Sequence, residues 1–327
     1  MIGTIGTDFE AVTAPFRHEL VVHCYRMLGS VHEAEDLAQE TLIRAWKARD
    51  RYDEQRASVR TWLYRIATNV CLTALEGRAR RPLPSGLGSA SDDPGAPLVP
   101  DFEVPWLQPL PDTYLRQDQG DPVSRATARA GVRLALIAAM QLLPPRQRAV
   151  LVLRDVLEFS AAEVAAQLDT SAAAVNSALQ RARAALAAAS PRENALREPD
   201  DRSVRETVER YVRAFESADV DTLVTLLTDD AVLEMPPVPL WYAGRVDYGR
   251  FIARVFTMRG TGWRMVPTSA NGQPALVAYC PDETGVLRLH TLQVLTVSTQ
   301  GIARTVVFQD PPVFAAFGLA PVLGPGH

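Results

Sequence analysis

The stretch that organises this chain runs from residue 143 to residue 186 and reads LPPRQRAVLVLRDVLEFSAAEVAAQLDTSAAAVNSALQRARAAL. Ser160 and Glu163 have the spacing of a capping box, which predicts a helix over residues 161–168. Residues 169–171 (DTS) interrupt the apolar rhythm before a second helix. The apolar side chains of that helix recur at helical spacing, at Val175, Leu179, Ala182 and Leu186. The pattern predicts a helix-turn-helix.

The second helix has a polar side that suits DNA recognition. Its residues outside the apolar stripe are Ala173, Asn176, Ser177, Gln180, Arg181 and Arg183. In the major groove, small residues permit close approach, while amide and guanidinium groups reach base edges and phosphates. The same pattern also fits an ordinary amphipathic helix pair in an all-α core, so the rest of the chain has to decide between the two.

The length and composition of the chain indicate a multidomain globular protein. Its 327 residues predict two or three domains, and 47% hydrophobic with 22% charged residues is ordinary globular composition. Three widely spaced cysteines without a C-x-x-C motif argue against a disulfide framework or a zinc site and fit a reducing cytoplasm. We expect no signal peptide and no membrane span.

The net charge of −4 is unusual for a DNA-binding protein, but the charge is unevenly distributed. Residues 125–190 carry 8 Lys and Arg against 4 Asp and Glu, whereas residues 82–124 carry 1 against 7. The block that contains the helix-turn-helix is therefore basic. Because phosphate neutralisation supplies most non-specific affinity, we expect weak DNA binding by the isolated chain.

Two further segments carry functional patterns. The helix predicted over residues 31–46 has an acidic outer face, which by itself fits a solvated surface. Residues 60–76, RTWLYRIATNVCLTALE, place aromatic side chains beside basic and amide groups. That combination suits single-stranded nucleic acid, because unpaired bases stack on rings while cations hold the backbone. Burial in a core is the alternative for Trp62 and Tyr64.

These segments together resemble a known family. RMLGSVHEAEDLAQETLIRAW (residues 26–46) and TWLYRIATNVC (residues 61–71) resemble region 2 of the sigma-70 superfamily, of the extracytoplasmic-function type. Residues 143–186 resemble region 4 of the same family. The resemblance implies a cytoplasmic bacterial sigma factor that directs RNA polymerase to promoters. Its implied partners are promoter DNA and the clamp coiled coil and flap of the polymerase core, with no cofactor, metal or membrane.

The resemblance also assigns roles to residues. Core polymerase binding is implied for Asp36, Leu37, Gln39 and Glu40. Reading of the −10 element is implied for Tyr52, Arg60, Trp62, Arg65 and Asn69. Reading of the −35 element falls to the six polar-side residues of the second helix in the helix-turn-helix.

We predict five segments along the chain. They are a region 2 domain (residues 1–81), a linker rich in Pro, Gly and Asp (82–124), a region 4 domain (125–190), a short linker (191–201) and a C-terminal domain (202–327). The composition of the first linker is typical of a flexible coil. Trp106 and Leu107 differ from their surroundings as apolar anchors, which predicts docking on a neighbouring domain or on polymerase.

The C-terminal domain has helices first and then strands, near residues 229–235, 263–269, 275–280, 285–298 and 302–309. This order, with residues 214–245, AFESADVDTLVTLLTDDAVLEMPPVPLWYAGR, resembles the SnoaL-like, cystatin-like cone. The predicted fold class is thus two all-α sigma domains, a region 2 helical bundle and a region 4 helix-turn-helix, followed by an α+β cone.

The cone resembles domains that bind small molecules or catalyse proton transfer. The residues predicted to line a regulatory pocket are Glu234, Met235, Trp241, Tyr242, Arg288, His290 and Gln309. A single histidine, His290, does not make a catalytic pair, so we expect no catalytic residues. The expected role is regulatory, either by binding a small-molecule ligand or by packing on the sigma domains and the linker. Two alternatives are a one-component helix-turn-helix regulator that senses a ligand and a SnoaL-like enzyme with a DNA tether.

Overall fold

In the computed structural model the chain forms two compact units, and the structure describes residues 9–115, 131–189 and 201–324. One unit combines residues 1–81 with residues 107–194, and the other combines residues 82–106 with residues 195–327. The chain therefore leaves the helical unit after Arg81 and returns to it at Leu107. Residues 116–124 of the predicted first linker and 191–200 of the second lie outside the described residues.

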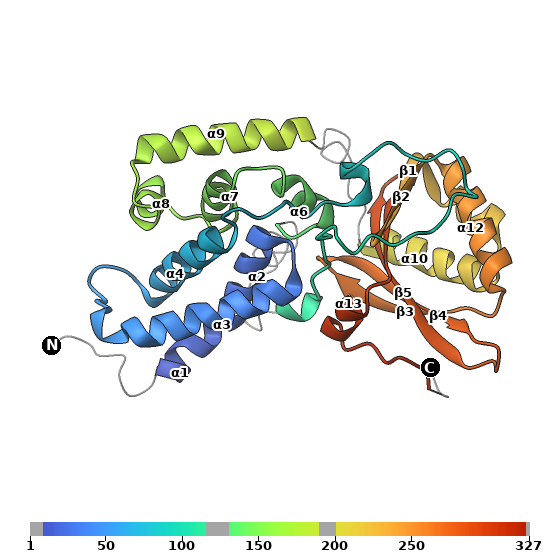
Figure 1. Cartoon of the computed structure of the whole chain (residues 1–327), viewed down its shortest axis with the longest axis horizontal. Helices are drawn as coiled ribbons and strands as arrows, with labels where there is room; N and C mark the ends of the chain where they lie inside the picture. Colours follow the sequence, from blue (N-terminus) through green and yellow to red (C-terminus); the bar gives the residue numbers. More distant parts are fainter. Residues whose placement is uncertain (1–8, 116–130, 190–200, 325–327) are drawn as a thin grey trace. The chain divides into compact units, whose positions relative to one another are not determined.

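The region 2 domain is a bundle of three main helices after a short α1 (Phe9–Thr13): α2 (Arg17–Leu28), α3 (Val31–Ala48) and α4 (Val59–Ala74) (Figure 1). Gly29 ends α2 at a φ of 70°, a conformation that favours glycine. Ser30 caps α3, and Ser58 caps α4 by accepting from the Thr61 amide at 3.1 Å. The bundle buries Leu20, Cys24, Met27, Ala34, Leu63 and Ala67.

The region 4 domain consists of α6 (Leu134–Met140), α7 (Pro145–Leu151), a π-helical turn η5 (Val152–Val156), α8 (Ala161–Gln167) and α9 (Ala172–Ala189). The predicted capping box is confirmed: the Ser160 hydroxyl accepts from the Glu163 amide at 3.2 Å, and the Glu163 carboxylate accepts from the Ser160 amide at 2.7 Å. Asp169 makes the tight turn at a φ of 50°. The predicted helix-turn-helix is present.

The described part of the first linker is buried near its two ends, at residues 82–84 and 106–111, whereas most of residues 86–103 is exposed. Residues 107–115 lie on the region 2 domain, with Leu107 and Leu110 fully buried. Gln108 holds this segment by donating its amide to the Gly29 carbonyl at 3.0 Å and by accepting from the Ser30 hydroxyl at 2.8 Å. The two predicted anchors belong to different units, since Leu107 is part of the helical unit and Trp106 is part of the other.

The second unit contains α10 (Asp201–Glu216), α11 (Val220–Thr225), α12 (Arg245–Arg259), α13 (Pro311–Ala316) and a six-stranded sheet. The strands are β1 (Leu227–Met235), β2 (Val238–Ala243), β3 (Arg264–Ala270), β4 (Gln273–Pro281), β5 (Leu287–Ser298) and β6 (Gly301–Phe308), in the spatial order β2-β1-β6-β5-β4-β3. Strands β3 to β6 form the predicted antiparallel meander. The sheet as a whole is mixed, because β1 pairs with β6 in parallel.

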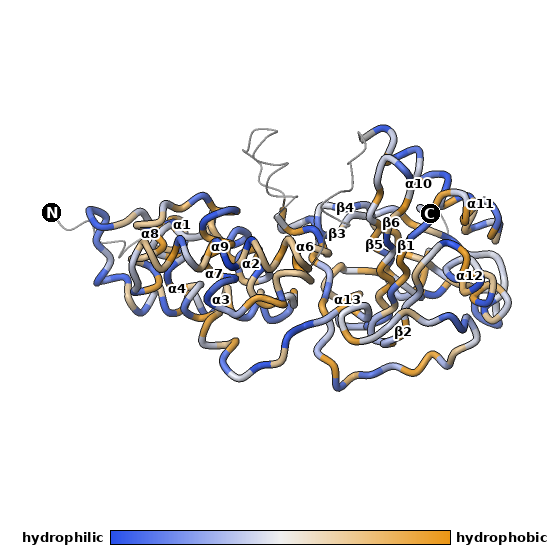
Figure 2. The backbone as a smooth tube through the Cα atoms, turned by 90° about the horizontal axis from the view of Figure 1, so that it is seen from above, coloured by the Kyte–Doolittle hydropathy of each residue, from blue (hydrophilic) through white to orange (hydrophobic). Residues whose placement is uncertain are grey.

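Helices α10, α11 and α12 pack on the sheet and enclose an aromatic core (Figure 1). Phe215 meets Trp263 edge to face at 5.5 Å, and Tyr242 stacks on Phe251 at 4.9 Å. Figure 2 shows hydrophobic residues along the central strands β1, β5 and β6. Gly249 allows α12 to approach α11, since a Cβ there would lie 2.5 Å from Val224. No helix within the described ranges is long and apolar enough to cross a membrane.

Candidate functional site

The helix α9 presents the predicted DNA-reading side to solvent. Val175, Leu179 and Ala182 are buried against the rest of the region 4 domain. All six residues predicted to read the −35 element are exposed: Ala173, Asn176, Ser177, Gln180, Arg181 and Arg183. Arg183 is held by Asp155 through two hydrogen bonds of 2.7 and 2.8 Å. The geometry is that of a helix whose outer side is free to enter a groove.

The residues predicted to read the −10 element differ in accessibility. Asn69 and Arg65 are exposed on α4, and Trp62 is partly exposed. Tyr52 is buried and donates to the Ala57 carbonyl at 2.9 Å, and burial raises the pKa of its hydroxyl. Arg60 is an intermediate case, bound to Glu19 at 2.9 Å. Tyr52 is therefore part of the core beneath the predicted −10 surface and is not exposed on it.

The acidic side of α3 is open for contact with a partner. Asp36 and Gln39 are exposed, and Leu37 and Glu40 are partly exposed. Glu40 pairs along the same helix with Arg44 at 2.7 Å. Exposed ion pairs of this kind contribute little to stability. Breaking the Glu40–Arg44 pair when a partner binds therefore costs little free energy.

The seven residues predicted to line a pocket in the C-terminal domain do not gather at one place. Glu234 and Trp241 are register partners on β1 and β2, next to Met235 and Tyr242 on the same strands. Arg288 and His290 lie on β5, and Gln309 follows β6. Arg288 and Gln309 are exposed, and Arg288 pairs with Asp282 at 2.6 Å.

Glu234 is at the centre of a contact that the sequence did not reveal. Its side chain is 0% exposed and forms an ion pair with Arg304 of β6. The second carboxylate oxygen accepts from the amide of Ser85, in the 3₁₀ turn η3 (Pro84–Gly86) of the linker, at 2.8 Å. A buried carboxylate requires such partners, so Glu234 ties the linker to the sheet.

Further along, the C-terminal domain binds the backbone of the linker. Trp241 donates its indole N–H to the Gly88 carbonyl at 3.0 Å, and Tyr242 donates to the Asp93 carbonyl at 3.1 Å. Arg254 of α12 donates to two linker carbonyls, those of Pro94 and Ala96, each at 2.7 Å. The carbonyls of Trp241 in the edge strand β2 and of Pro237 just before it accept from the Ser91 and Asp101 amides of the linker, each at 2.9 Å. Residues 85–101 are thus recognised mainly through main-chain groups.

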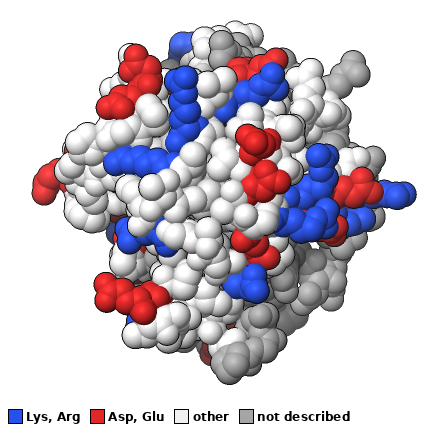
Figure 3. Space-filling view, turned by 90° about the vertical axis from the view of Figure 1, so that its right-hand side faces the viewer, with Lys and Arg blue, Asp and Glu red and all other residues white. Residues whose placement is uncertain are grey.

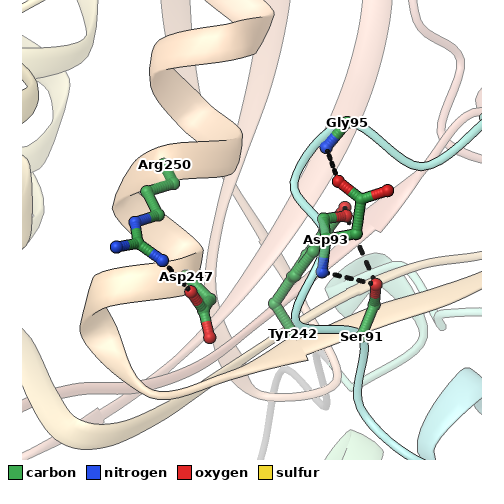
Figure 4. Close-up of polar contacts among 6 residues, drawn as sticks. All are labelled: Ser91, Asp93, Gly95, Tyr242, Asp247 and Arg250. Atoms are coloured by element: carbon green, nitrogen blue, oxygen red, sulfur yellow. Dashed lines mark hydrogen bonds and ion pairs between the residues drawn. The ribbon is translucent and has the colours of Figure 1, made fainter.

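Figure 4 shows the middle of this contact. The Asp93 carboxylate accepts from the Gly95 amide at 2.7 Å, and the Ser91 hydroxyl accepts from the Asp93 amide at 3.2 Å, which together shape the turn that Tyr242 contacts. Arg250, on the same helix as Arg254, pairs only within α12, with Asp247 at 3.1 Å. On the face drawn in Figure 3, basic and acidic side chains are interspersed.

A buried polar network lies between the helices and the sheet. The Tyr211 hydroxyl donates to Gln293 at 3.0 Å, and the Tyr248 hydroxyl donates to Thr305 at 3.1 Å. The two tyrosine hydroxyls are 3.4 Å apart. Burial raises the pKa of both tyrosines, so they stay neutral and serve as hydrogen-bonding groups. Among the described residues, no group of three acidic, histidine or cysteine side chains is placed to hold a metal.

His290 is in a setting that keeps its ring neutral. The imidazole packs edge to face on Trp263 at 5.1 Å. Burial, and secondarily the charge of Arg259, lowers its pKa to about 4. A proton shuttle at neutral pH needs a value near 7, so the setting of His290 favours a structural role.

This shift predicts a pH dependence of stability. Because the folded-state pKa of His290 lies below its usual 6.5, the unfolded chain binds more protons between pH 6.5 and 4. His290 therefore lowers the free energy of unfolding only below pH 6.5. As the pH drops towards 4, this loss reaches on the order of 2–3 kcal/mol. His290→Gln should flatten the slope in urea unfolding measured from pH 4 to 7. Identical slopes for the variant and the parent chain would contradict the prediction. His23, buried with a pKa lowered to about 3, supplies a remaining slope in both.

Comparison with known proteins agrees with this architecture. Three family models match the chain: Sigma-70 region 2 over residues 15–81, Sigma-70 region 4 over residues 133–186 and the SnoaL-like domain over residues 208–305. The predicted fold class is confirmed in all three parts.

Curated and solved relatives extend the match to the full chain. The chain is 49% identical over 315 residues to the ECF RNA polymerase sigma factor SigG of Mycobacterium tuberculosis, covering 95% of this chain and 84% of that protein. It is 32% identical over 225 residues to SigJ of the same species, covering 68% and 62%. The crystal structure of SigJ, an extracytoplasmic function sigma factor, aligns over 96% of this chain and 99% of that one, with a TM-score of 0.63 and 24% identity. The chain therefore belongs to the family of extracytoplasmic function RNA polymerase sigma factors and carries a SnoaL-like domain at its C-terminal end.

Proposed function

We propose that this sigma factor directs core RNA polymerase to promoters with three surfaces. The acidic side of α3 docks on the core enzyme, α4 and the preceding loop read the −10 element, and α9 reads the −35 element. The observation that carries the proposal is α9, which buries Val175, Leu179 and Ala182 while all six reading residues are exposed. A helix with this division of sides is what major-groove recognition needs.

The C-terminal domain regulates this activity by binding the linker. Residues 85–101 lie between the segments that belong to regions 2 and 4, and the domain holds them by side-chain and backbone hydrogen bonds. The regulatory ligand is therefore the linker itself. The polar interior of the cone, with its paired tyrosine hydroxyls and Gln293, already satisfies its own hydrogen bonds.

The test is transcription with the full chain. Core polymerase with and without the chain is supplied with a library of promoter fragments, and run-off transcripts are sequenced. Transcripts that depend on the chain support the proposal. A chain that binds DNA but neither co-migrates with core polymerase nor starts transcripts is a one-component regulator, and the sigma reading is then wrong.

Substitutions on α9 test its role on the promoter so identified. Gln180→Ala and Arg181→Ala should each weaken holoenzyme binding to the −35 element by about 1–3 kcal/mol, because each removes base or phosphate contacts. Ala189→Gln, at the exposed last position of the same helix and two turns beyond Arg181, is the control and should change little. Equal losses in all three variants would exclude a specific role for the predicted residues.

A further inference from the structure

Glu19 connects helix α2 to the predicted −10 surface on α4. Its carboxylate oxygen Oε2 accepts from the Nε of Arg60 at 2.9 Å and from the hydroxyl of Tyr64 at 3.0 Å. Hydrogen bonds to an ionised carboxylate are about twice as strong as those between neutral groups. Neither the sequence pattern nor the family resemblance assigned a role to Glu19. Its contacts make it the residue that holds one of the predicted DNA-reading side chains in place.

The Arg60 guanidinium is held by Glu19 and by Tyr64, and it is still accessible. Its carbon Cζ lies 4.9 Å from the centroid of the Tyr64 ring, a cation–π contact. The side chain of Arg60 is 38% exposed, whereas that of Glu19 is 20% exposed. Because Glu19 binds Nε, the terminal nitrogens of the guanidinium can donate to a phosphate or to a base edge. Arg60 can therefore contact DNA without leaving Glu19.

Tyr64 is a fixed part of the region 2 core. It is 1% exposed, and its ring packs edge to face on His23 at 5.1 Å. The Thr68 hydroxyl donates to the Tyr64 carbonyl at 2.7 Å and is bonded to Nε2 of His23 at 3.0 Å. Burial raises the pKa of the Tyr64 hydroxyl, and the Glu19 carboxylate adds to this rise, so the hydroxyl stays protonated and donates. The partners that hold Arg60 are thus themselves held by the core.

Fixing Arg60 in advance favours selective binding. An arginine that is mobile in the free protein loses side-chain freedom when it contacts DNA, and this ordering weakens binding by about threefold to tenfold. Since Glu19 already orders Arg60, that penalty is small for a DNA sequence whose groups match the fixed position. A sequence whose groups lie elsewhere requires the bond to Glu19 to break first. The negative charge of Glu19 also repels phosphates, which lowers non-specific attraction to DNA.

We propose that Glu19 is a positioning residue that determines selectivity for the −10 element by fixing the Arg60 guanidinium. The inference deepens the proposed function and rests on its assignment of Arg60 to the −10 element. Loss of the carboxylate frees Arg60 and removes a negative charge from this surface. Selectivity for the −10 element then falls about threefold to tenfold, while non-specific binding to single-stranded DNA stays constant or rises.

The experiment measures −10 selectivity with holoenzyme that contains the full chain. The templates are the promoter identified by run-off sequencing and copies that each carry one substituted base pair in the −10 element. Selectivity is the ratio of transcripts from the promoter and from a copy, so changes in affinity for core polymerase cancel. Arg60→Ala should lower this ratio at particular base pairs, and Glu19→Gln should lower it about threefold to tenfold at the same ones. The double variant should match Arg60→Ala alone, because Glu19 acts through Arg60.

Two further variants separate positioning from other effects of the substitution. Glu33→Gln is the matched control, since it removes a carboxylate of the same region that pairs with Arg78 at 2.8 Å and with Arg81 at 3.0 Å. It should leave the ratio unchanged. Glu19→Asp keeps the charge but shortens the side chain, so the ratio should fall as in Glu19→Gln. Circular dichroism establishes which variants fold, and Glu19→Asp decides alone if Glu19→Gln does not fold.

Binding of a fluorescent single strand of random sequence, about 12 nucleotides long, distinguishes positioning from a loss of stability. Glu19→Gln should bind this strand as well as the parent chain or more tightly, and Glu19→Asp should bind it equally well. A region 2 domain that is only destabilised would bind it more weakly, and that result contradicts the inference.

The transcript ratios give the remaining outcomes. Folded Glu19 variants that keep the parent ratio overturn the inference. An equal fall for Glu19→Gln with and without Arg60 also overturns it, because Glu19 then supports region 2 without acting through Arg60. If Arg60→Ala leaves the ratio unchanged, the −10 assignment of Arg60 is wrong and the inference fails with it. If no transcript depends on the chain, the proposed function as a whole is wrong.

Discussion

Arg304→Met is expected to lower the free energy of unfolding of the C-terminal domain by about 3–5 kcal/mol, because it leaves a buried charge without its counter-ion. Glu234 is 0% exposed, and Arg304, itself only 19% exposed, is the cation paired with it. After the substitution, the carboxylate keeps its hydrogen bond from the Ser85 amide but has lost its cation. Removing one member of a buried pair costs much more than removing both.

Two companion variants isolate this effect in urea unfolding followed by tryptophan fluorescence. Arg304→Met combined with Glu234→Gln should recover most of the loss, since no charge is then buried. Arg245→Met breaks the pair with Asp229, whose side chains are 48% and 86% exposed, and should cost less than about 1 kcal/mol. If Arg304→Met and Arg245→Met lower the free energy of unfolding by similar amounts, burial of Glu234 does not determine the effect, and the prediction is wrong.

Local patterns predicted the helices because their signals are contained within a few residues. The capping box at Ser160 and the apolar stripe of α9 needed no knowledge of the rest of the chain, and both are present. Strand β2 was not predicted. Its sequence includes Pro239 and follows Pro236 and Pro237, which argue against a strand, but an edge strand tolerates proline because its outer amides are not needed for the sheet.

The linker was predicted to be a flexible coil because Pro, Gly, Ser and Asp dominate its composition. In the structure its two ends are buried, and the exposed stretch between them is held by hydrogen bonds that composition does not encode. Arg254 and Trp241 bind linker carbonyls, which every residue type possesses, and these partners are some 150 positions away in the sequence. Glu234 was predicted as a functional residue, but its partner Arg304 lies 70 positions away on a strand that only the fold brings adjacent.

For the predicted −10 residues of region 2, too, the sequence alone did not decide which side chains are accessible. Trp62, Arg65 and Asn69 are accessible as the resemblance implied, whereas Tyr52 is buried. For Tyr64 the sequence left burial open as an alternative, and it lies in the core with its hydroxyl bonded to Glu19 at 3.0 Å. Aromatic and basic residues that are adjacent in sequence give the same pattern whether they contact a nucleotide or a protein side chain. Tyr64 and Arg60 lie against Phe159 of the region 4 domain.

Removal of residues 200–327 should raise promoter-dependent transcription roughly tenfold, a change within the usual range of regulatory coupling. The C-terminal domain binds residues 85–101, and in the proposed regulation this binding is given up when the linker engages polymerase. In the truncated chain the linker has no such contacts to break, so this free-energy cost is absent. Affinity for core polymerase should stay within about threefold, because the acidic side of α3 belongs to the other unit.

A matched pair of single variants on α12 tests whether linker release is the cause. Arg254→Ala removes the donor to the Pro94 and Ala96 carbonyls, so hydrogen exchange of amides in residues 91–101 should accelerate and transcription should rise in the same direction as in the truncated chain. Arg250→Ala lies one turn away, removes the same charge and breaks only the pair with Asp247. If both variants raise transcription equally, charge on α12 is the cause. If Arg254→Ala releases the linker without changing transcription, the linker is not the element through which the C-terminal domain acts.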